Sequence, residues 1–391
     1  MSQPVNAAAY LTTPSSPLAV KPAPYTPARS NELVIKTHAI ALNWFDVVVQ
    51  HMSSNVTPWL KHPFIPGSDV AGEVVEVGSS VTRFKPGDRV LGHAAGTDKR
   101  SNRACEGAFQ SYVVLQQDLT SKIPNSLEYE RACMVPLTLS TAACGLYLPD
   151  LLNLTHPASF SLSQTPPPQS SSPHPEPTDK PFTEKPILLI WGAATTVGTS
   201  ALQLALASNY TVYTTSSPAS YPLLRALGAT KTFDYASPTA VPDIIAAMRG
   251  KPSAGALAIG PASTQKCIPI VAASTGRKFI AQASVPTPDS MPPKGFAMAK
   301  FIAKYLWFSV STKLSCLVNG VGVKFIWGSD VVGCELGKMV YAGFLEGALE
   351  RGEFVVRPEA RVVGEGLEAL DAALDVVRQG GLRAEKIVVK I

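Results

Sequence analysis

A turn rich in small residues follows a continuous apolar segment and could bind a phosphate group. Residues 186–192 (PILLIWG) read as a buried strand, and residues 199–208 have the spacing of a helix. Small side chains let the backbone approach a pyrophosphate, and the first turn of a helix offers unpaired N–H groups. Packing alone is the alternative, because the turn lacks a strict GxGxxG pattern. The expected phosphate-binding positions are Gly192, Ala194, Thr195, Thr196 and Val197.

The end of the next predicted strand indicates which dinucleotide would fit this turn. Residues 211–216 (TVYTTS) end on hydroxyl side chains, where folds specific for NAD carry an acidic residue. Hydroxyl groups can donate to a 2′-phosphate that a carboxylate would repel, so we expect NADPH as cofactor. For Arg225 and Tyr235 the alternatives are a solvated helix residue and a tyrosine at the edge of the core. The residues expected around the adenosine half are Thr215, Ser216, Ser217, Arg225 and Tyr235.

The elements that must position this turn alternate along the chain. Strand and helix patterns alternate from residue 186 to 284, which is typical of a doubly wound parallel sheet. Residues 31–128 instead read as short β segments broken by Gly, Pro and Asp, and they predict a compact, mostly antiparallel domain. The C-terminal tail has mixed character and is expected to return to that first domain. We therefore expect an α/β protein divided into residues 1–136 with 331–391, and residues 137–330.

Two segments fall outside this alternation. Residues 155–183, rich in Pro and Ser, cannot bury enough apolar surface to order themselves and predict a surface insertion. Residues 301–327 are the most apolar stretch, but three lysines interrupt them before ~18 uncharged residues accumulate. We expect this stretch to be buried in the core or in an interface. The segment 323–329 (VKFIWGS) could form an edge strand that pairs two copies, so both a monomer and a homodimer stay open.

Composition narrows the class of protein. The chain has 34 Lys and Arg against 29 Asp and Glu, a net charge of +5, and the basic residues are not clustered as nucleic-acid binding requires. Six cysteines are scattered without a CxxC pair, which disfavours a disulfide framework or a zinc knuckle. The N-terminal residues lack the pattern of a secretory or transit peptide. We expect a cytoplasmic enzyme with a small-molecule substrate, without a nucleic-acid partner and without a membrane.

Four ordered blocks resemble one known superfamily. They are 66–92 (PGSDVAGEVVEVGSSVTRFKPGDRVLG), 191–205, 224–235 and 381–391, and they look like medium-chain dehydrogenases/reductases. Within that superfamily the sequence is similar to a zinc-independent fungal branch related to quinone reductases and to trans-acting enoyl reductases. The resemblance implies a GroES-like, mostly β catalytic domain packed against a Rossmann domain, with nicotinamide in the cleft between them.

The resemblance also allows the zinc site of the alcohol-dehydrogenase branch to be compared residue by residue. The positions that match the Cys, His and Cys ligands are Asn43, Ser68 and Leu137, and none offers a thiolate or an imidazole. We expect no metal, and hydride transfer to an activated double bond of an enone, enoyl thioester or quinone. By resemblance, Asn43 and Thr141 are expected to donate hydrogen bonds to the cofactor amide or to a developing oxyanion. Asp46, Ser68 and Asp69 are expected to hold the loop around the nicotinamide, and turn capping is the alternative, favoured for Ser68 and Asp69.

The proton donor and the substrate stay open in this comparison. Related enoyl reductases carry a Lys or a Tyr where this chain has Val48 and Asn55, so water or His51 is considered instead. One hypothesis is a reductase of free small molecules. A second is a trans-acting enoyl reductase of a polyketide synthase, with a carrier-bound substrate and a basic rim from Arg100 and Arg103. A third is a non-redox isomerase or cyclase that binds the cofactor on the same fold.

Overall fold

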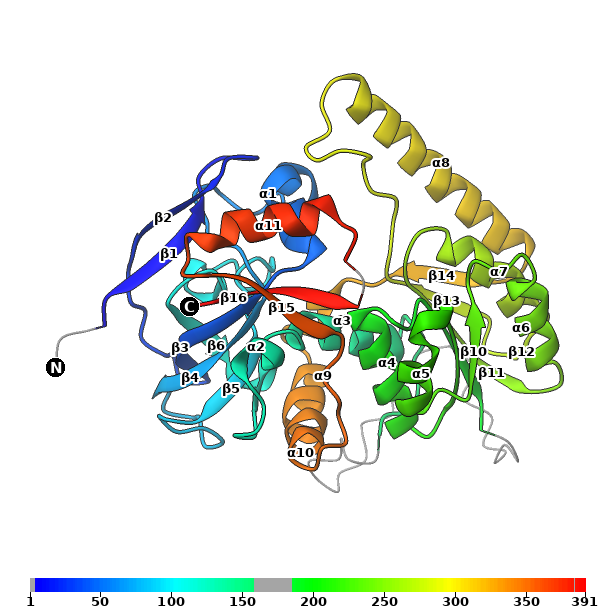
Figure 1. Ribbon diagram of the computed structural model, residues 1–391, viewed down its shortest axis with the longest axis horizontal. Helices are drawn as coiled ribbons and strands as arrows, with labels where there is room; N and C mark the ends of the chain where they lie inside the picture. The colour runs from blue at the N-terminus through cyan, green and yellow to red at the C-terminus, as the bar shows by residue number, and fades with distance from the viewer. Residues whose placement is uncertain (1–3, 158–184, 383) are drawn as a thin grey trace.

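The computed structural model describes residues 4–157, 185–382 and 384–391. Two sheets lie side by side, with helices between them and on their outer faces (Figure 1). One sheet is mostly antiparallel and the other is parallel, so the predicted mixed α/β class is confirmed. The predicted Pro/Ser-rich insertion lies outside the described residues from residue 158 onward.

The first sheet combines strands from both ends of the chain. Its order is β15–β16–β3–β4–β5–β7, and β6 pairs with β3. The pair β15–β16 is parallel and the other pairs are antiparallel. The C-terminal strand β16 pairs directly with β3, Val388 opposite Ala41, so the tail lies in the same sheet as residues near the N-terminus. The strands are β3 (Glu32–Ala41), β4 (Asp69–Val77), β5 (Arg89–His93), β6 (Tyr112–Gln116), β7 (Thr120–Lys122), β15 (Glu359–Glu365) and β16 (Glu385–Lys390).

A hairpin and a helix beside this sheet were not predicted. Strands β1 (Asn6–Leu11) and β2 (Leu18–Ala23) form a separate antiparallel pair. Helix α1 (Trp44–Val56) lies in the region that we expected to be mostly β, and no helix was predicted there. The run of three valines at 47–49 favours a strand by local propensity. The helix nevertheless forms, and its start is stabilised because the Asp46 side chain accepts a hydrogen bond from the backbone N–H of Asn43, the residue before the helix.

The second sheet is parallel throughout and confirms the doubly wound pattern. Its order is β10–β9–β8–β11–β13–β14, and β12 pairs with β11. Strand β14 has one neighbour, so an edge strand is confirmed for residues 323–325 of the predicted segment 323–329, while residues 328–331 form a turn of 3-10 helix. The strands are β8 (Ile187–Trp191), β9 (Thr211–Ser216), β10 (Lys231–Asp234), β11 (Pro252–Ala258), β12 (Thr275–Gly276), β13 (Phe279–Gln282) and β14 (Gly322–Phe325).

Helices cover both faces of the parallel sheet, and shorter helices connect it to the first sheet. Helix α3 stands between the two sheets (Figure 1). A single apolar cluster runs from Ala41 and Leu91 of the first sheet through Leu139 of α3 to Leu188 and Ile190 of β8. The two halves therefore share a continuous core. The remaining helices are α2 (Tyr129–Ala132), α3 (Pro136–Tyr147), α4 (Thr196–Ala207), α5 (Tyr221–Ala226), α6 (Ala240–Met248), α7 (Ser263–Ala273), α8 (Phe296–Val318), α9 (Glu335–Lys338), α10 (Glu346–Glu350) and α11 (Ala369–Gln379).

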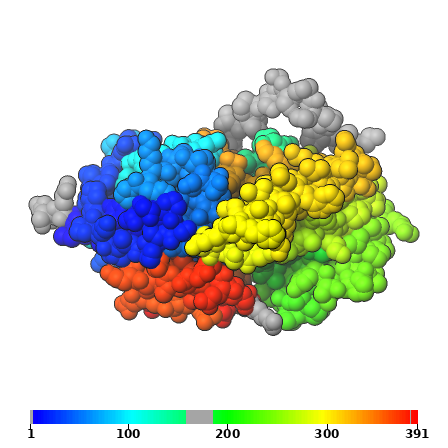
Figure 2. All heavy atoms as spheres, turned by 90° about the horizontal axis from the view of Figure 1, so that it is seen from above, coloured from blue at the N-terminus to red at the C-terminus, as the bar shows by residue number. Residues whose placement is uncertain are grey.

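Helix α8 corrects the expectation for residues 301–327. Residues 301–318 are not buried in the core, because Thr312 and Cys316 are the buried residues of α8 and most of its apolar side chains face solvent. Farther along the stretch, Val321 and Ile326 are buried, and burial of the α8 part in an interface stays a prediction. The helix lies across the surface above both halves of the molecule (Figure 2). No helix in the described ranges has the length and apolar character needed to cross a bilayer.

Candidate active site

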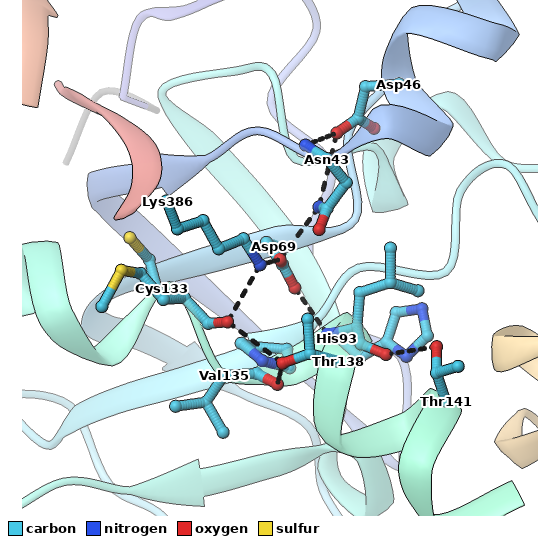
Figure 3. Close-up of polar contacts among 12 residues, drawn as sticks. Asn43, Asp46, Asp69, His93, Cys133, Val135, Thr138, Thr141 and Lys386 are labelled. Atoms are coloured by element: carbon cyan, nitrogen blue, oxygen red, sulfur yellow. Dashed lines mark hydrogen bonds and ion pairs between the residues drawn. The ribbon is translucent and has the colours of Figure 1, made fainter. Parts of the chain in front are cut away.

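The start of α1 and the start of β4 bring three of the polar side chains together. Asn43 precedes α1, and its backbone N–H donates to Oδ2 of Asp46 over 2.7 Å. The Asn43 side-chain nitrogen Nδ2 donates to Oδ2 of Asp69 over 2.9 Å (Figure 3). The predicted pair Asn43 and Asp46 is therefore in direct contact, and Asp69 fixes the Asn43 amide.

Asp69 is also the centre of a buried ion pair that the sequence did not reveal. The Lys386 ammonium lies 2.5 Å from Asp69 Oδ2 and donates to the carbonyl of Met134. The other carboxylate oxygen accepts from the backbone N–H of Leu137 over 2.6 Å. The exposed fractions are 0% for Asp69 and 5% for Lys386. The pair ties β4, β16 and the start of α3 to one point.

In this network the donor groups of Asn43 and Thr141 face oxygens of the protein. Nδ2 of Asn43 lies near carboxylate oxygens of both Asp69 and Asp46, which can accept from an amide NH2 group. The Thr141 hydroxyl donates to the carbonyl of Leu137 over 2.8 Å. Their remaining oxygens, Oδ1 of Asn43 and Oγ1 of Thr141, are acceptors. The geometry therefore suits binding of a donor group, such as a carboxamide NH2, better than stabilisation of an oxyanion.

Burial changes the acidity of Asp46. The side chain is 2% exposed, and desolvation raises the pKa of Asp46 to about 7, partly offset by the hydrogen bond from the Asn43 backbone. Both protonation states are therefore populated near neutral pH. Thr141 is linked to the Asp46 carboxyl indirectly, by hydrogen bonds through Leu137, Asp69 and Asn43.

A second buried polar chain runs from His93 into the interior. His93 ends β5 opposite Asp69, and its Nδ1 lies 2.9 Å from the Ser140 hydroxyl. Ser140 is 2.8 Å from the Tyr341 hydroxyl, which donates to the carbonyl of Pro136. Since the single Tyr341 proton goes to Pro136, Ser140 donates to Tyr341 and His93 Nδ1–H donates to Ser140. This leaves Nε2 as a lone pair, buried and without a partner among the described residues.

Three aromatic rings form a wall beside these polar groups. Phe45 in α1 and Trp59 after it both make edge contacts with Trp327, at centroid distances of 5.6 and 6.5 Å. The adjacent Gly328 lies so close to Thr141 that a Cβ at this glycine would be 2.4 Å from the threonine oxygen. The wall therefore joins α1 to the loop after β14, next to the start of α3. The sequence analysis did not identify this cluster, because its members are far apart in the chain.

The predicted phosphate turn lies between β8 and α4. Gly192 has φ +83°, and a Cβ there would lie 2.5 Å from the carbonyl of Ile259. Thr195 caps α4: its hydroxyl accepts from Gly198 N–H and donates to the Gly192 carbonyl. The first backbone N–H groups of α4, at Thr196 and Val197, begin a helix and point out of its end. Together with Ala194 they line the turn.

The residues expected around the adenosine half divide into two groups. Thr215 is completely buried and its hydroxyl accepts from Gly192 N–H, so it shapes the turn and cannot reach a phosphate in this conformation. Ser216 is buried as well, and its hydroxyl donates to the carbonyl of Ser217. Tyr235 is 50% exposed and its N–H donates to Ser216. Arg225 is exposed and lies over the Tyr221 ring.

Three further residues do not have the surroundings that the sequence suggested. His51 faces α11, near Arg378 and Asp375, so the geometry gives it no role at the Asp46 end of α1. Arg100 binds Asp98 and the backbone of the loop after β14, and Arg103 binds Glu32 and Glu106. Neither arginine is a free cation for a basic rim. In the described part of the chain no group of three or more His, Cys, Asp or Glu side chains could hold a metal ion.

A segment in the N-terminal part of the chain matches a known domain family. Residues 29–125 match the alcohol dehydrogenase GroES-like domain. This confirms the GroES-like character expected of the first sheet. The solved structure of an alcohol dehydrogenase superfamily protein from Novosphingobium aromaticivorans has the same overall fold, with a TM-score of 0.68, 18% identity and 99% of both chains covered.

Fungal proteins match the chain over nearly its full length. Dehydrogenase pigH of Monascus ruber is 43% identical over 389 residues, which cover 99% of this chain and 100% of that protein. Trans-enoyl reductase himH of Aspergillus japonicus is 34% identical over 365 residues, with 92% of this chain and 90% of that protein covered. The chain is therefore an oxidoreductase of the medium-chain dehydrogenase/reductase superfamily and belongs to the fungal branch that includes these proteins.

Proposed function

We propose that the protein is an NADPH-dependent, zinc-independent reductase that transfers a hydride to an activated double bond. The observation that carries this proposal is the Asp69–Lys386 pair. Asp69 binds the Asn43 side chain and the Leu137 backbone, at two of the three positions that would have to hold catalytic zinc. Where catalytic zinc would have to bind, the Lys386 ammonium thus neutralises the Asp69 carboxylate. A hydride acceptor that needs no Lewis acid fits this site.

The residues of the second sheet fit a phosphorylated dinucleotide. Gly192 opens the turn, the free N–H groups at the start of α4 can bind a pyrophosphate, and β9 ends without an acidic residue. Of the ten positions expected to bind cofactor, we propose direct contacts for Gly192, Ala194, Thr196, Val197, Ser217, Arg225 and Tyr235. Thr195, Thr215 and Ser216 are proposed to shape the site.

The polar groups near α1 would hold the reacting partners in place. When bound, NADPH supplies the hydride. Asn43 Oδ1 and Thr141 Oγ1 are proposed to accept hydrogen bonds from a carboxamide and so orient its ring. The aromatic wall of Phe45, Trp59 and Trp327 excludes water from one side and offers an apolar surface to a conjugated acceptor. We propose that water supplies the proton, since the protons of Asn43 and Thr141 bind protein oxygens.

The sheet topology supports the proposed division into residues 1–136 with 331–391, and residues 137–330. Strands β15 and β16 lie in the first sheet, and strands β8 to β14 lie in the second. Helix α3 begins at Pro136, at the proposed boundary, and packs on the core of both. The substrate would bind where the two halves meet.

The proposal is tested with purified protein, NADPH and NADH. Fluorescence titration is expected to show tighter binding of NADPH, and absorbance of NADPH is expected to fall with at least one enone, quinone or enoyl thioester. Metal analysis should find no stoichiometric zinc, and a chelator should not reduce turnover. Zinc-dependent turnover, or no affinity for either dinucleotide, would overturn the proposal.

A trans-acting enoyl reductase is the second candidate function, because a relative with 34% identity carries the name trans-enoyl reductase. Comparison of an enoyl thioester on a carrier protein with the same acyl group on a small thiol tests this candidate. A much higher kcat/KM for the carrier-bound form supports it. Tight NADPH binding without turnover of any acceptor would instead favour a non-redox isomerase or cyclase.

A further inference from the structure

Helix α8 presents an exposed apolar surface that the proposed reaction does not use. Nine of the fifteen large apolar side chains that are exposed in the described residues lie on this helix. With 23 residues, the helix is about 35 Å long and about 10 Å wide, so one face covers about 350 Å². Exposed apolar patches of a few hundred Å² often mark interaction sites. The nine residues are Phe296, Ile302, Tyr305, Leu306, Trp307, Val310, Leu314, Leu317 and Val318.

Five of these side chains form one continuous row. They are spaced by four residues, and rows with this spacing form the ridges by which helices commonly pack. The buried residues Thr312 and Cys316 attach α8 to the molecule on the opposite side of the helix. The row is therefore not needed to hold α8 in place. Its members, with exposed fractions from 49% to 78%, are Ile302, Leu306, Val310, Leu314 and Val318.

We propose that this row binds the same row of a second copy of the chain, with the two α8 helices antiparallel and centred on Val310. The row has the same spacing in both directions from Val310, so a twofold axis near this residue makes it self-complementary. Leu306 of one copy then lies near Leu314 of the other. In the neighbouring row, the small side chains of Ala303 and Ser311 leave space on either side of Trp307, which is itself 74% exposed.

The charges on α8 are compatible with this arrangement. The helix has three lysines and no acidic residue, and two of the lysines, Lys300 and Lys304, bind Asp289. In the antiparallel pair these two lysines face the uncharged end of the other helix, at residues 316–320. Lys313 faces Trp307 of the second copy, where an ammonium can lie over the indole ring. Like charges therefore do not meet.

The size of the surface sets the expected strength of association. Stable dimers bury roughly 800 Å² on each partner, and the α8 face covers less than half of that area. We therefore expect reversible, concentration-dependent dimers. The arrangement also leaves the phosphate turn and the polar side chains of Asn43 and Asp46 at the start of α1 untouched, so dinucleotide binding should not depend on it.

Sedimentation velocity over a range of protein concentrations tests the dimer. Wild-type protein is expected to shift from monomer to dimer, and Val310→Asp is expected to remain monomeric because it places two carboxylates near the axis. Ala297→Asp is the matched control: it adds the same charge to the exposed first turn of α8, away from the row, and should still dimerise. Thermal melting should show that both variants are folded.

Disulfide cross-linking tests the antiparallel register. Val310→Cys should form a covalent dimer on mild oxidation, because the two copies of residue 310 are closest to the axis. Val318→Cys should not, since its two copies would be about 24 Å apart along the helices. A wild-type monomer at all concentrations, equal cross-linking at both positions, or a Val310→Asp protein that still dimerises would overturn the proposal. A wild-type protein that forms no dimer but binds anionic vesicles, with that binding lost in Val310→Asp, would assign the surface to a membrane and also overturn the proposal.

Discussion

The Lys386 ammonium and the Asp69 carboxylate are 2.5 Å apart in an almost completely buried site. Lys386 comes from the last strand and Asp69 from β4, 317 residues away, so the pair fixes the C-terminal strand to the part of the site that binds Asn43. Removal of one partner leaves the other as an uncompensated buried charge.

Lys386→Met is therefore expected to lower the free energy of unfolding by about 3–5 kcal/mol. Urea unfolding followed by circular dichroism measures this loss. The double variant Asp69→Asn with Lys386→Met should recover much of it, because a neutral amide still accepts from Leu137 N–H and no charge remains buried. A single variant as stable as the wild type would show that the pair is not held as described.

Asp46 predicts a specific dependence of stability on pH. Burial raises the pKa of this carboxyl to about 7 in the folded protein, above its unfolded value near 4. Between these values the folded state binds more protons, so stability falls as pH rises from about 4 to about 7. Each unit of the raised pKa corresponds to about 1.4 kcal/mol.

Asp46→Asn should remove this contribution. The difference in unfolding free energy between variant and wild type is expected to change across pH 4 to 7 and to be constant above pH 8. Asp150→Asn, which changes an exposed aspartate, is the control and should follow the wild type. Parallel curves for wild type and Asp46→Asn would contradict a raised pKa at this position.

His93 is expected to remain neutral with its proton on Nδ1. Burial lowers the pKa of His93 to about 4, and the Ser140–Tyr341–Pro136 chain requires a donor at Nδ1. Long-range ¹H–¹⁵N NMR spectra report the tautomer, and His93→Gln assigns the signal. The signal should not titrate between pH 5.5 and 8. A midpoint near 6.5, or a proton on Nε2, would show that the chain runs in the other direction.

Arg225 tests the expected preference for the phosphorylated cofactor. Arg225→Ala should weaken NADPH binding about tenfold, or ~1.4 kcal/mol, and leave NADH binding unchanged, since only NADPH carries the 2′-phosphate. Fluorescence titration of both dinucleotides measures this. Arg249→Ala, an exposed arginine at the end of α6, is the control. Equal losses for both dinucleotides would mean that Arg225 acts on a shared part of the cofactor.

Much of the parallel sheet could be predicted from sequence, because each element there carries its own local signal. Strand β9 occupies the predicted residues 211–216, and the turn rich in small residues lies between a strand and a helix as predicted, with Gly192 at a positive φ. Helix α1 was missed because its valine run favours a strand locally. The capping contact between Asn43 and Asp46 does not change the spacing of apolar residues, from which helices were predicted.

The site near α1 could be predicted only in part. Asn43, Asp46 and Thr141 follow from the resemblance, but their hydrogen-bond roles depend on Asp69, Lys386 and Leu137, which approach them only in the folded chain. A single lysine in a C-terminal strand has no sequence signal that distinguishes a buried charge from an exposed one. Such long-range polar contacts can be identified only in the folded structure.

Gly192 and Gly250 offer a controlled test of close packing at the phosphate turn. Both have positive φ, +83° and +75°, so alanine at either position costs about 1–2 kcal/mol of backbone strain. A Cβ at Gly192 would in addition lie 2.5 Å from the Ile259 carbonyl, whereas at Gly250 nothing lies within 4 Å. The difference between the two variants therefore isolates the clash.

Gly192→Ala should be the less stable protein in urea unfolding and should lose most of its NADPH affinity, because the turn must move away from Ile259 and shift the start of α4. Gly250→Ala should bind NADPH as the wild type does. Equal stability and equal affinity for the two variants would show that the turn does not require a glycine for its approach to Ile259.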